Sequence, residues 1–326
     1  MRRSGESTPS QGEYLVYIGT YTNASSKGIY VCRFNPRTRR VGRVELAART
    51  VNPSFLTIAP NGRFLYAVNE LGEFDGQKSG AVSAFAIHWP GGKLTLLNQV
   101  ASQGTAPCYI AADHSGKYIL VANYGAGSVA VFPILRAGRL GKATAFVQHK
   151  GSSVNPQRQA GPHAHSVNVS PDNRFALSAD LGLDEVLASR FDSSNGTLAP
   201  NNPPYAKVLP GSGPRHFVFS PNGKFVYVVS EMGSILTVFA YNRTQGSLRR
   251  LQTVSTLPKT FKGESTGAEV QIAPSGRFLY ASNRGDNTIA VFSIDPKKGM
   301  LSPVEYVPTQ GKTPRMFQID PTGSYL

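Results

Sequence analysis

Two histidines stand two positions apart in the stretch GPHAHSVNVSPDNR, residues 161–174. His163 and His165 open an alternating run that is typical of a β-strand. Side chains two positions apart point to the same face of a regular strand, so both imidazoles should share one side. An imidazole has an ordinary pKa of about 6.5, which makes each ring a candidate proton acceptor at neutral pH.

Arginines and glutamates stand at comparable places in other parts of the chain. Arg215 and Glu231 flank one turn, and Arg284 and Arg315 occupy matching places near two later turns. A guanidinium fork binds a phosphate or a carboxylate through two parallel hydrogen bonds. These side chains make one site only if the fold gathers them, because up to about 150 residues separate them along the chain.

The elements that must position them belong to an internal repeat of about fifty residues. Examples are APNGRFLYAVNE at 59–70, SPNGKFVYVVSE at 220–231 and APSGRFLYASNR at 273–284. The aromatic anchors of the copies lie 47 to 57 residues apart, at Tyr14, Phe64, Tyr118, Phe175, Phe225, Phe278 and Tyr325. Seven copies at this spacing predict seven structural units in one chain.

Each unit contains four short strands joined by tight turns, as residues 215–254 illustrate. Alternation is visible in FVYVV and LTVFAY, and no stretch has a helical period. Four strands repeated seven times predict an all-β, seven-bladed β-propeller at 13–326, in which each blade buries its faces against its neighbours. The chain stops inside the second strand of the seventh unit, so we expect a truncated last blade.

The repeat predicts where the ionisable side chains lie. In each unit we take the Gly or Asn of the tight turn as a pivot, for example Asn173 or Gly223. The residues eight positions before and eight positions after this pivot should pair at the same end of a hairpin, for example His165 with Leu181 and Arg215 with Glu231. The first strand of a propeller blade lines the central channel. One mouth of the channel should therefore hold His165, His163, Arg215, Arg284, Arg315, Glu231, Glu70, Tyr21 and Tyr124, with Glu269 joining them through a β-bulge.

Composition limits the other classes of function. The net charge is +15, and part of it lies in the run RFNPRTRRVGR, which we interpret as an exposed hairpin turn because it has no aromatic interleaving. Cys32 and Cys108 lie in apolar surroundings without metal-ligand spacing. No apolar run approaches the about 20 residues of a membrane helix. Residues 1–12 should form a disordered leader, and we expect a cytoplasmic location.

The chain from Tyr14 onward resembles the lactonase family of seven-bladed propellers, typified by the propeller-type 6-phosphogluconolactonase. The stretches HSVNVSPDNR, GSGPRHFVFSPNGKFVYVVSE, APSGRFLYASNRGDNTIAVFSID and KTPRMFQIDPTGSYL carry the resemblance. It implies a site made by a histidine, a glutamate and two arginines on one face of the propeller. At matching positions these are His165, Glu231, Arg215 and Arg284, the four that the repeat selects independently.

The resemblance implies hydrolysis of a sugar lactone, with 6-phosphogluconolactone as substrate and 6-phosphogluconate as product. His165 would act as general base and Arg215 would stabilise the oxyanion. Glu231 would orient Arg215 or shuttle a proton, and Arg284 and Arg315 would hold the phosphate. We interpret His163, Glu269, Tyr124 and Tyr21 as substrate-binding residues. Such an activity belongs to carbohydrate metabolism, in the pentose phosphate pathway.

Two alternatives remain open on the same scaffold. One is a cycloisomerase acting on a carboxylated muconate, as in a related fungal carboxymuconate-lactonizing enzyme, since several carboxylates would also explain the arginines. The other is a binding propeller without catalysis. In every case we expect no metal and no cofactor, because an arginine-rich mouth repels a dication. We also expect no nucleic-acid partner, no membrane contact, and a monomer or weak oligomer.

Overall fold

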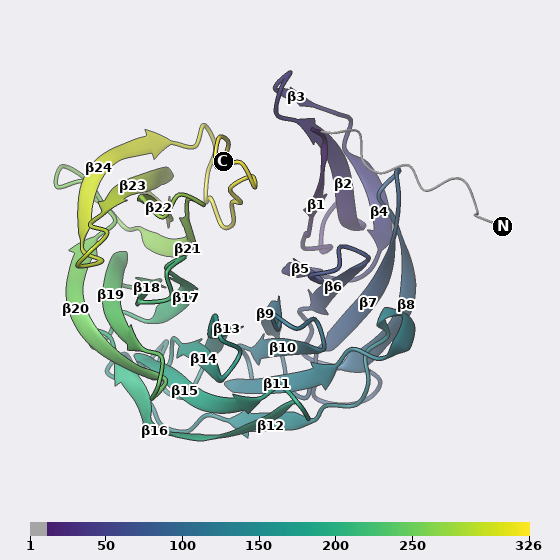
Figure 1. Ribbon diagram of the computed structural model, residues 1–326, viewed down its shortest axis with the longest axis horizontal. Helices are drawn as coiled ribbons and strands as arrows, with labels where there is room; N and C mark the ends of the chain where they lie inside the picture. Colours follow the sequence, from purple (N-terminus) through teal and green to yellow (C-terminus); the bar gives the residue numbers. More distant parts are fainter. Residues whose placement is uncertain (1–11) are drawn as a thin grey trace.

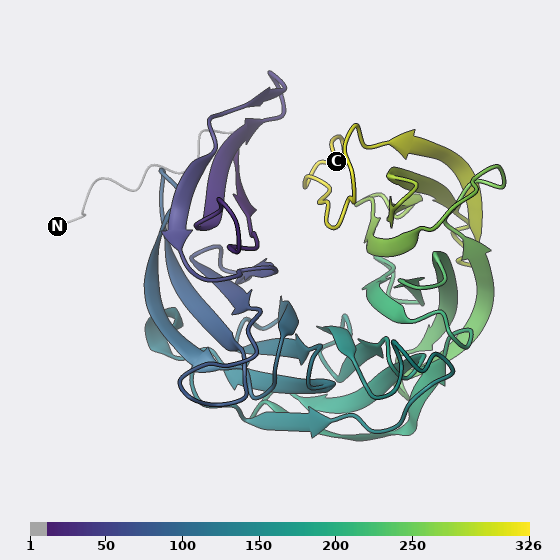
Figure 2. The same cartoon turned by 180° about the vertical axis from the view of Figure 1, so that it is seen from behind.

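The computed structural model describes residues 12–326, so all of the predicted leader except Gly12 lies outside the described residues. Antiparallel four-stranded sheets follow one another around a central axis, as Figures 1 and 2 show from the two sides. The predicted propeller architecture is confirmed. In the described part of the chain the only helical element is a short 3-10 turn, η1 (Arg136–Gly138), and no helix there is long and apolar enough to cross a membrane.

Five of the sheets have the simple order of a propeller blade, in which each strand pairs with the next one along the chain. In the first sheet β4 pairs with β2 beside the short β3. The strands are β1 (Tyr14–Ile18), β2 (Gly28–Asn35), β3 (Arg40–Val41) and β4 (Glu45–Arg49); β5 (Leu56–Ile58), β6 (Phe64–Asn69), β7 (Ala81–His88) and β8 (Lys93–Ala101); β9 (Pro107–Ala112), β10 (Tyr118–Asn123), β11 (Ser128–Pro133) and β12 (Ala145–Gln148); β13 (Ala164–Val169), β14 (Phe175–Asp180), β15 (Glu185–Asp192) and β16 (Thr197–Lys207); β17 (Pro214–Phe219), β18 (Phe225–Ser230), β19 (Ile235–Asn242) and β20 (Ser247–Ser255); β21 (Thr266–Ile272), β22 (Phe278–Arg284), β23 (Thr288–Ile294) and β24 (Leu301–Pro308).

The C-terminal segment, residues 309–326, forms no strand and is what the structure has of the seventh repeat. It lies between the sixth sheet and the first one (Figure 1). Tyr325 packs edge-on against Phe34 with ring centroids 5.1 Å apart, and its hydroxyl donates a hydrogen bond to the Pro36 carbonyl at 2.8 Å. The last residues of the chain therefore contact the first sheet directly.

The hydrophobic core lies between blades rather than within them. Each of five buried clusters combines side chains from two consecutive sheets. One example packs Phe175 and Leu177 of β14 against Phe217 and Val228 of the next sheet. Because no blade has a core of its own, consecutive blades stabilise one another.

The predicted turn pivots explain why glycine recurs. All six pivots have positive φ, between 60° and 73°, a conformation that glycine adopts without steric cost and asparagine with little; they are Gly62, Gly116, Asn173, Gly223, Gly276 and Gly323. A second set of glycines, in the turn between the third and fourth strands, packs directly on the aromatic anchor of the preceding blade. Gly246, for example, faces the ring of Phe175, and a Cβ there would overlap the ring.

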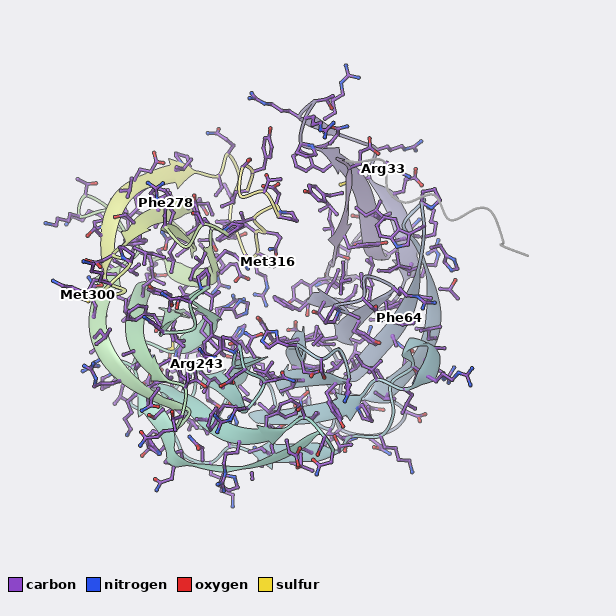
Figure 3. The ribbon with its side chains drawn as sticks, in the orientation of Figure 1. Arg33, Phe64, Arg243, Phe278, Met300 and Met316 are labelled. Atoms are coloured by element: carbon purple, nitrogen blue, oxygen red, sulfur yellow. The ribbon has the colours of Figure 1, made fainter. Side chains whose placement is uncertain are left out.

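The inner strands β5, β9, β13, β17 and β21 contact one another in succession around the axis. They lie closest to the centre of the ring in Figure 1. The anchors Phe64 and Phe278, which belong to different repeats, lie on opposite sides of the ring in Figure 3. The repeat therefore places the equivalent ends of several first strands around one channel, as the sequence predicts.

Candidate active site

The structure brings together the four residues that the repeat and the resemblance both select. His165 lies on β13, Arg215 on β17, Glu231 just after β18, and Arg284 at the end of β22. The side chains of His165, Arg215 and Glu231 are 5%, 2% and 9% exposed, and that of Arg284 is 17% exposed. The four predicted positions thus form one nearly buried cluster of ionisable groups.

Glu231 is the centre of this cluster. Its Oε2 accepts hydrogen bonds from Nε of Arg215 at 3.1 Å and lies 2.9 Å from Nη2 of Arg284. Its Oε1 accepts one from Nη2 of Arg158 at 2.7 Å. Oε2 is also 3.9 Å from Nε2 of His165, which is too long for a hydrogen bond. One carboxylate therefore holds three guanidinium groups and faces the imidazole.

The charge state of Glu231 follows from these neighbours. Burial alone would raise the pKa of the carboxyl group. Electrostatic interactions with His165, Arg215 and Arg284 and the hydrogen bond from Arg158 outweigh burial and hold the pKa of Glu231 well below its usual range. Glu231 therefore stays ionised and orients the arginines, but it is a poor proton donor.

His165 is held as a neutral imidazole. Burial, followed by electrostatic interactions with Arg215 and with the neighbouring His216, lowers its pKa well below 6.5, and Glu231 only partly opposes this shift. Nδ1 of His165 lies 3.6 Å from Sγ of Cys108. Burial raises the pKa of that thiol to about 12, so Cys108 remains a protonated packing residue. In the tautomer whose Nδ1–H faces Sγ of Cys108, Nε2 of the neutral ring has no proton and is the proton acceptor near Glu231.

His163 lies beside the cluster and contacts Tyr124. Its ring stacks on that of Tyr124 with centroids 4.6 Å apart, and Nδ1 lies 3.0 Å from the Tyr124 carbonyl oxygen. Its backbone N–H donates to Asp180, whose other carboxylate oxygen is 2.6 Å from Nδ1 of the buried His149. His165 meets the same Tyr124 ring edge-on at 5.4 Å. Both histidines of the opening motif therefore flank one phenol.

The predicted strand pairing needs a correction. The backbone of Leu181 bonds to His163, and that of Glu231 bonds to Gly213, so neither pairs with His165 or Arg215 as predicted. His165 and Arg215 are instead the extra residues of β-bulges in β13 and β17. The same irregularity occurs in β9 and β21, where it includes Cys108 and, as predicted, Glu269. A bulge leaves its extra residue out of the ladder and re-aims its side chain.

A second buried pair lies next to His165. Nδ1 of His216 is 3.1 Å from Oε2 of Glu269, and the rings of His216 and His165 meet with centroids 5.2 Å apart. Burial raises the pKa of Glu269 to about 7 and lowers that of His216 well below 6.5. Glu269 therefore supports His216 beneath the cluster instead of lying at the open mouth, where the sequence interpretation places it.

The remaining predicted residues form a neighbouring group near the surface. The Tyr21 hydroxyl donates to Oε2 of Glu70 at 2.8 Å and accepts from Nη2 of Arg315 at 3.0 Å. The charge of Arg315 contributes to the lowered pKa values of Arg215 and His165, so the two groups are within electrostatic range. Met316, next to Arg315, lies at the inner border of the ring in Figure 3.

Sequence reasoning missed Arg158 and His216. Arg158 lies in the loop 149–163, between β12 and β13 and outside the repeated phrase. His216 follows Arg215 directly, and strict alternation would point it away from the channel side. The adjacent pair Arg215–His216 at a strand end was the available signal, since two neighbouring polar residues in an otherwise apolar strand are consistent with a bulge.

A ring of four-stranded antiparallel sheets, with ionisable side chains gathered at the ends of its inner strands, defines the protein as a β-propeller with a polar site at its channel. Its sequence matches a family model described as lactonase, 7-bladed beta-propeller, over residues 15–326. The chain belongs to this seven-bladed lactonase family, which confirms the resemblance seen in the repeat motifs.

Similar proteins cover nearly the whole chain. A 6-phosphogluconolactonase of Bacillus subtilis is 34% identical over 314 residues, which are 96% of this chain and 87% of the relative. A 6-phosphogluconolactonase of Formosa agariphila is 35% identical over 95% of this chain and 88% of its own. The structure of a periplasmic gluconolactonase of Pseudomonas aeruginosa, 37% identical, superimposes with a TM-score of 0.89 over 95% of this chain and 87% of that protein.

Proposed function

We propose that this protein hydrolyses a sugar lactone, 6-phosphogluconolactone, to the open-chain acid 6-phosphogluconate. The observation that carries the proposal is the neutral, buried His165 beside an ionised Glu231 that holds Arg215 and Arg284. Relatives named 6-phosphogluconolactonase, at 34–35% identity over nearly the whole chain, support the choice of substrate.

In the proposed mechanism His165 acts as general base. Its Nε2 takes a proton from a water molecule while the water oxygen forms a bond to the lactone carbonyl carbon. The carbonyl π electrons move to the oxygen, and the resulting oxyanion is stabilised by the positive charges of Arg215 and Arg284. Arg284 is the more exposed of the two, so we assign it the direct contact with the reacting carbonyl.

Ring opening completes the reaction. The tetrahedral intermediate collapses, the bond between the carbonyl carbon and the ring oxygen breaks, and the ring oxygen leaves with the electron pair. The protonated His165 returns its proton to this oxygen, because the ionised Glu231 has none to give. We assign Arg315, whose Nη2 donates to the Tyr21 hydroxyl, to contact with a charged substituent of the sugar. Proton balance is then restored, and the free acid loses its proton to water.

The test is lactone hydrolysis by the purified full chain, followed as acid release above the spontaneous rate. His165→Gln should lower kcat about 100-fold or more, since general base catalysis contributes about 10²- to 10⁴-fold. His114→Gln, which changes an exposed histidine in a turn, is the matched control and should retain activity. Hydrolysis no faster than the spontaneous rate, or a fully active His165→Gln, would refute the proposal, and turnover of a carboxylated muconate alone would favour the cycloisomerase.

A further inference from the structure

We propose that Arg158 determines the specificity of this site for a lactone that carries an anionic substituent, a phosphate or a carboxylate. The inference rests on the proposed lactonase function and adds a residue that neither the repeat nor the resemblance selects. Three features support it. The loop fixes the backbone of Arg158 at the edge of the site, the Arg158 side chain makes few hydrogen bonds, and the surplus positive charge of the site is exposed to solvent mainly at Arg158.

The loop that presents Arg158 is firmly built. The Asn155 side chain accepts hydrogen bonds from the backbone N–H groups of Gln157 and Arg158, both at 3.0 Å. Gln159 is fully buried, and its amide donates to the Leu181 carbonyl at 2.8 Å while its Oε1 accepts from the backbone of Asn155 at 3.1 Å. The backbone at Arg158 is therefore fixed at the edge of the site.

The side chain of Arg158 is less constrained than the other arginines that hold Glu231. Arg215 also donates to the Ala268 carbonyl, and Arg284 also donates to the Gly267 carbonyl at 3.0 Å. The second partner of Arg158 is the neutral hydroxyl of Tyr124, at 3.3 Å. Its side chain is 42% exposed, against 2% and 17% for the other two. A ligand can therefore reach the Arg158 guanidinium most easily.

The charges of the cluster favour an anionic ligand at this place. Three guanidinium groups surround the single carboxylate of Glu231, which leaves a surplus of positive charge. Arg215 and Arg284 are largely buried and donate to Glu231 and to backbone carbonyls, although Nε of Arg284 has no partner among the described residues. The surplus charge therefore reaches solvent mainly through Arg158. A planar guanidinium with free N–H groups matches the oxygens of a phosphate in a bidentate way.

The experiment compares two lactones with and without the charged group. Arg158→Gln should raise KM for 6-phosphogluconolactone at least tenfold and leave KM for gluconolactone within about twofold, because a charge-assisted hydrogen bond is lost only with the phosphorylated substrate. Arg158→Lys, which keeps the charge but not the fork, should give an intermediate KM. Arg136→Gln, at an exposed arginine in η1, is the matched control and should change neither KM.

A binding measurement separates this inference from the catalytic proposal. Calorimetric titration with 6-phosphogluconate and with gluconate should show a loss of affinity in Arg158→Gln, by about tenfold or more, for the phosphorylated acid alone. Equal losses for both lactones, or for both acids, would overturn the inference and assign Arg158 to orienting Glu231. Unchanged values would overturn it as well. Absence of hydrolysis by the unaltered chain would refute the lactonase function, while the titration would still decide the role of Arg158.

Discussion

Glu231 shows how its surroundings decide the role of one carboxyl group. The sequence leaves two roles open, orienting an arginine or shuttling a proton. Burial would raise its pKa, but the interactions with His165 and with three guanidinium partners hold it well below the usual range, and this favours the first role. In the proposed mechanism His165 must then both take and return the proton, and its lowered pKa keeps it unprotonated and ready at neutral pH.

The pH dependence of hydrolysis tests this assignment. A base with a lowered pKa stays unprotonated as the pH falls, so kcat/KM should decline only well below pH 6.5, on the acid side. Glu231→Gln removes a charge that raises the His165 pKa, so the decline should move to still lower pH while kcat falls. The measurement is a pH–rate profile corrected for spontaneous hydrolysis.

Glu269→Gln is the control for that profile. It removes a buried carboxyl group whose pKa is raised to about 7, next to His216, and the acid-side decline should persist in this variant. A decline with its midpoint above pH 6.5 in the unaltered protein, or its disappearance in Glu269→Gln, would contradict the assignment of His165 as the titrating base.

At the level of the strands, the sequence predicts the repeat much better than the register. The aromatic anchors and the turn pivots can be recognised in the sequence, because an aromatic residue and a glycine or asparagine of positive φ recur at the same positions of the repeat, for example Phe175 and Gly223. The bulges at His165 and Arg215 are much harder to recognise in the sequence, because one extra residue in a six-residue strand breaks no long periodic pattern and only the adjacent polar pair Arg215–His216 indicates a bulge. Arg158 could not be predicted either, since its loop is absent from the repeated pattern.

The glycine that packs on an anchor ring gives a stability prediction. Gly246→Ala should destabilise the protein by about 2–4 kcal/mol, because a Cβ would overlap the Phe175 ring and φ is +64°. Gly62→Ala, with φ of +68° and nothing within 4 Å of the new Cβ, isolates the backbone cost and should lose only about 1–2 kcal/mol. Denaturant unfolding of both variants measures the difference, and equal losses would show that the ring contact contributes nothing.

At the scale of the whole molecule, the net charge of +15 should lower KM for an anionic substrate through long-range attraction. The positive field attracts an anionic lactone, and salt screens it over about 10 Å at 0.1 M but over about 3 Å at 1 M. KM for 6-phosphogluconolactone should therefore rise several-fold between 0.02 and about 0.5 M salt, whereas KM for uncharged gluconolactone should stay nearly constant. Steady-state kinetics at several salt concentrations measure this, and an equal response of both substrates would exclude long-range attraction.

The four irregular strand ends have a consequence for how such a protein can diversify. Cys108, His165, Arg215 and Glu269 occupy places that the main-chain ladder skips, so the identity of each side chain matters little to the register of the sheet around it. A mutation can therefore replace one of these residues while the propeller fold is kept. Members of the family that share this scaffold can therefore change the chemistry of the site through one inner-strand bulge residue at a time.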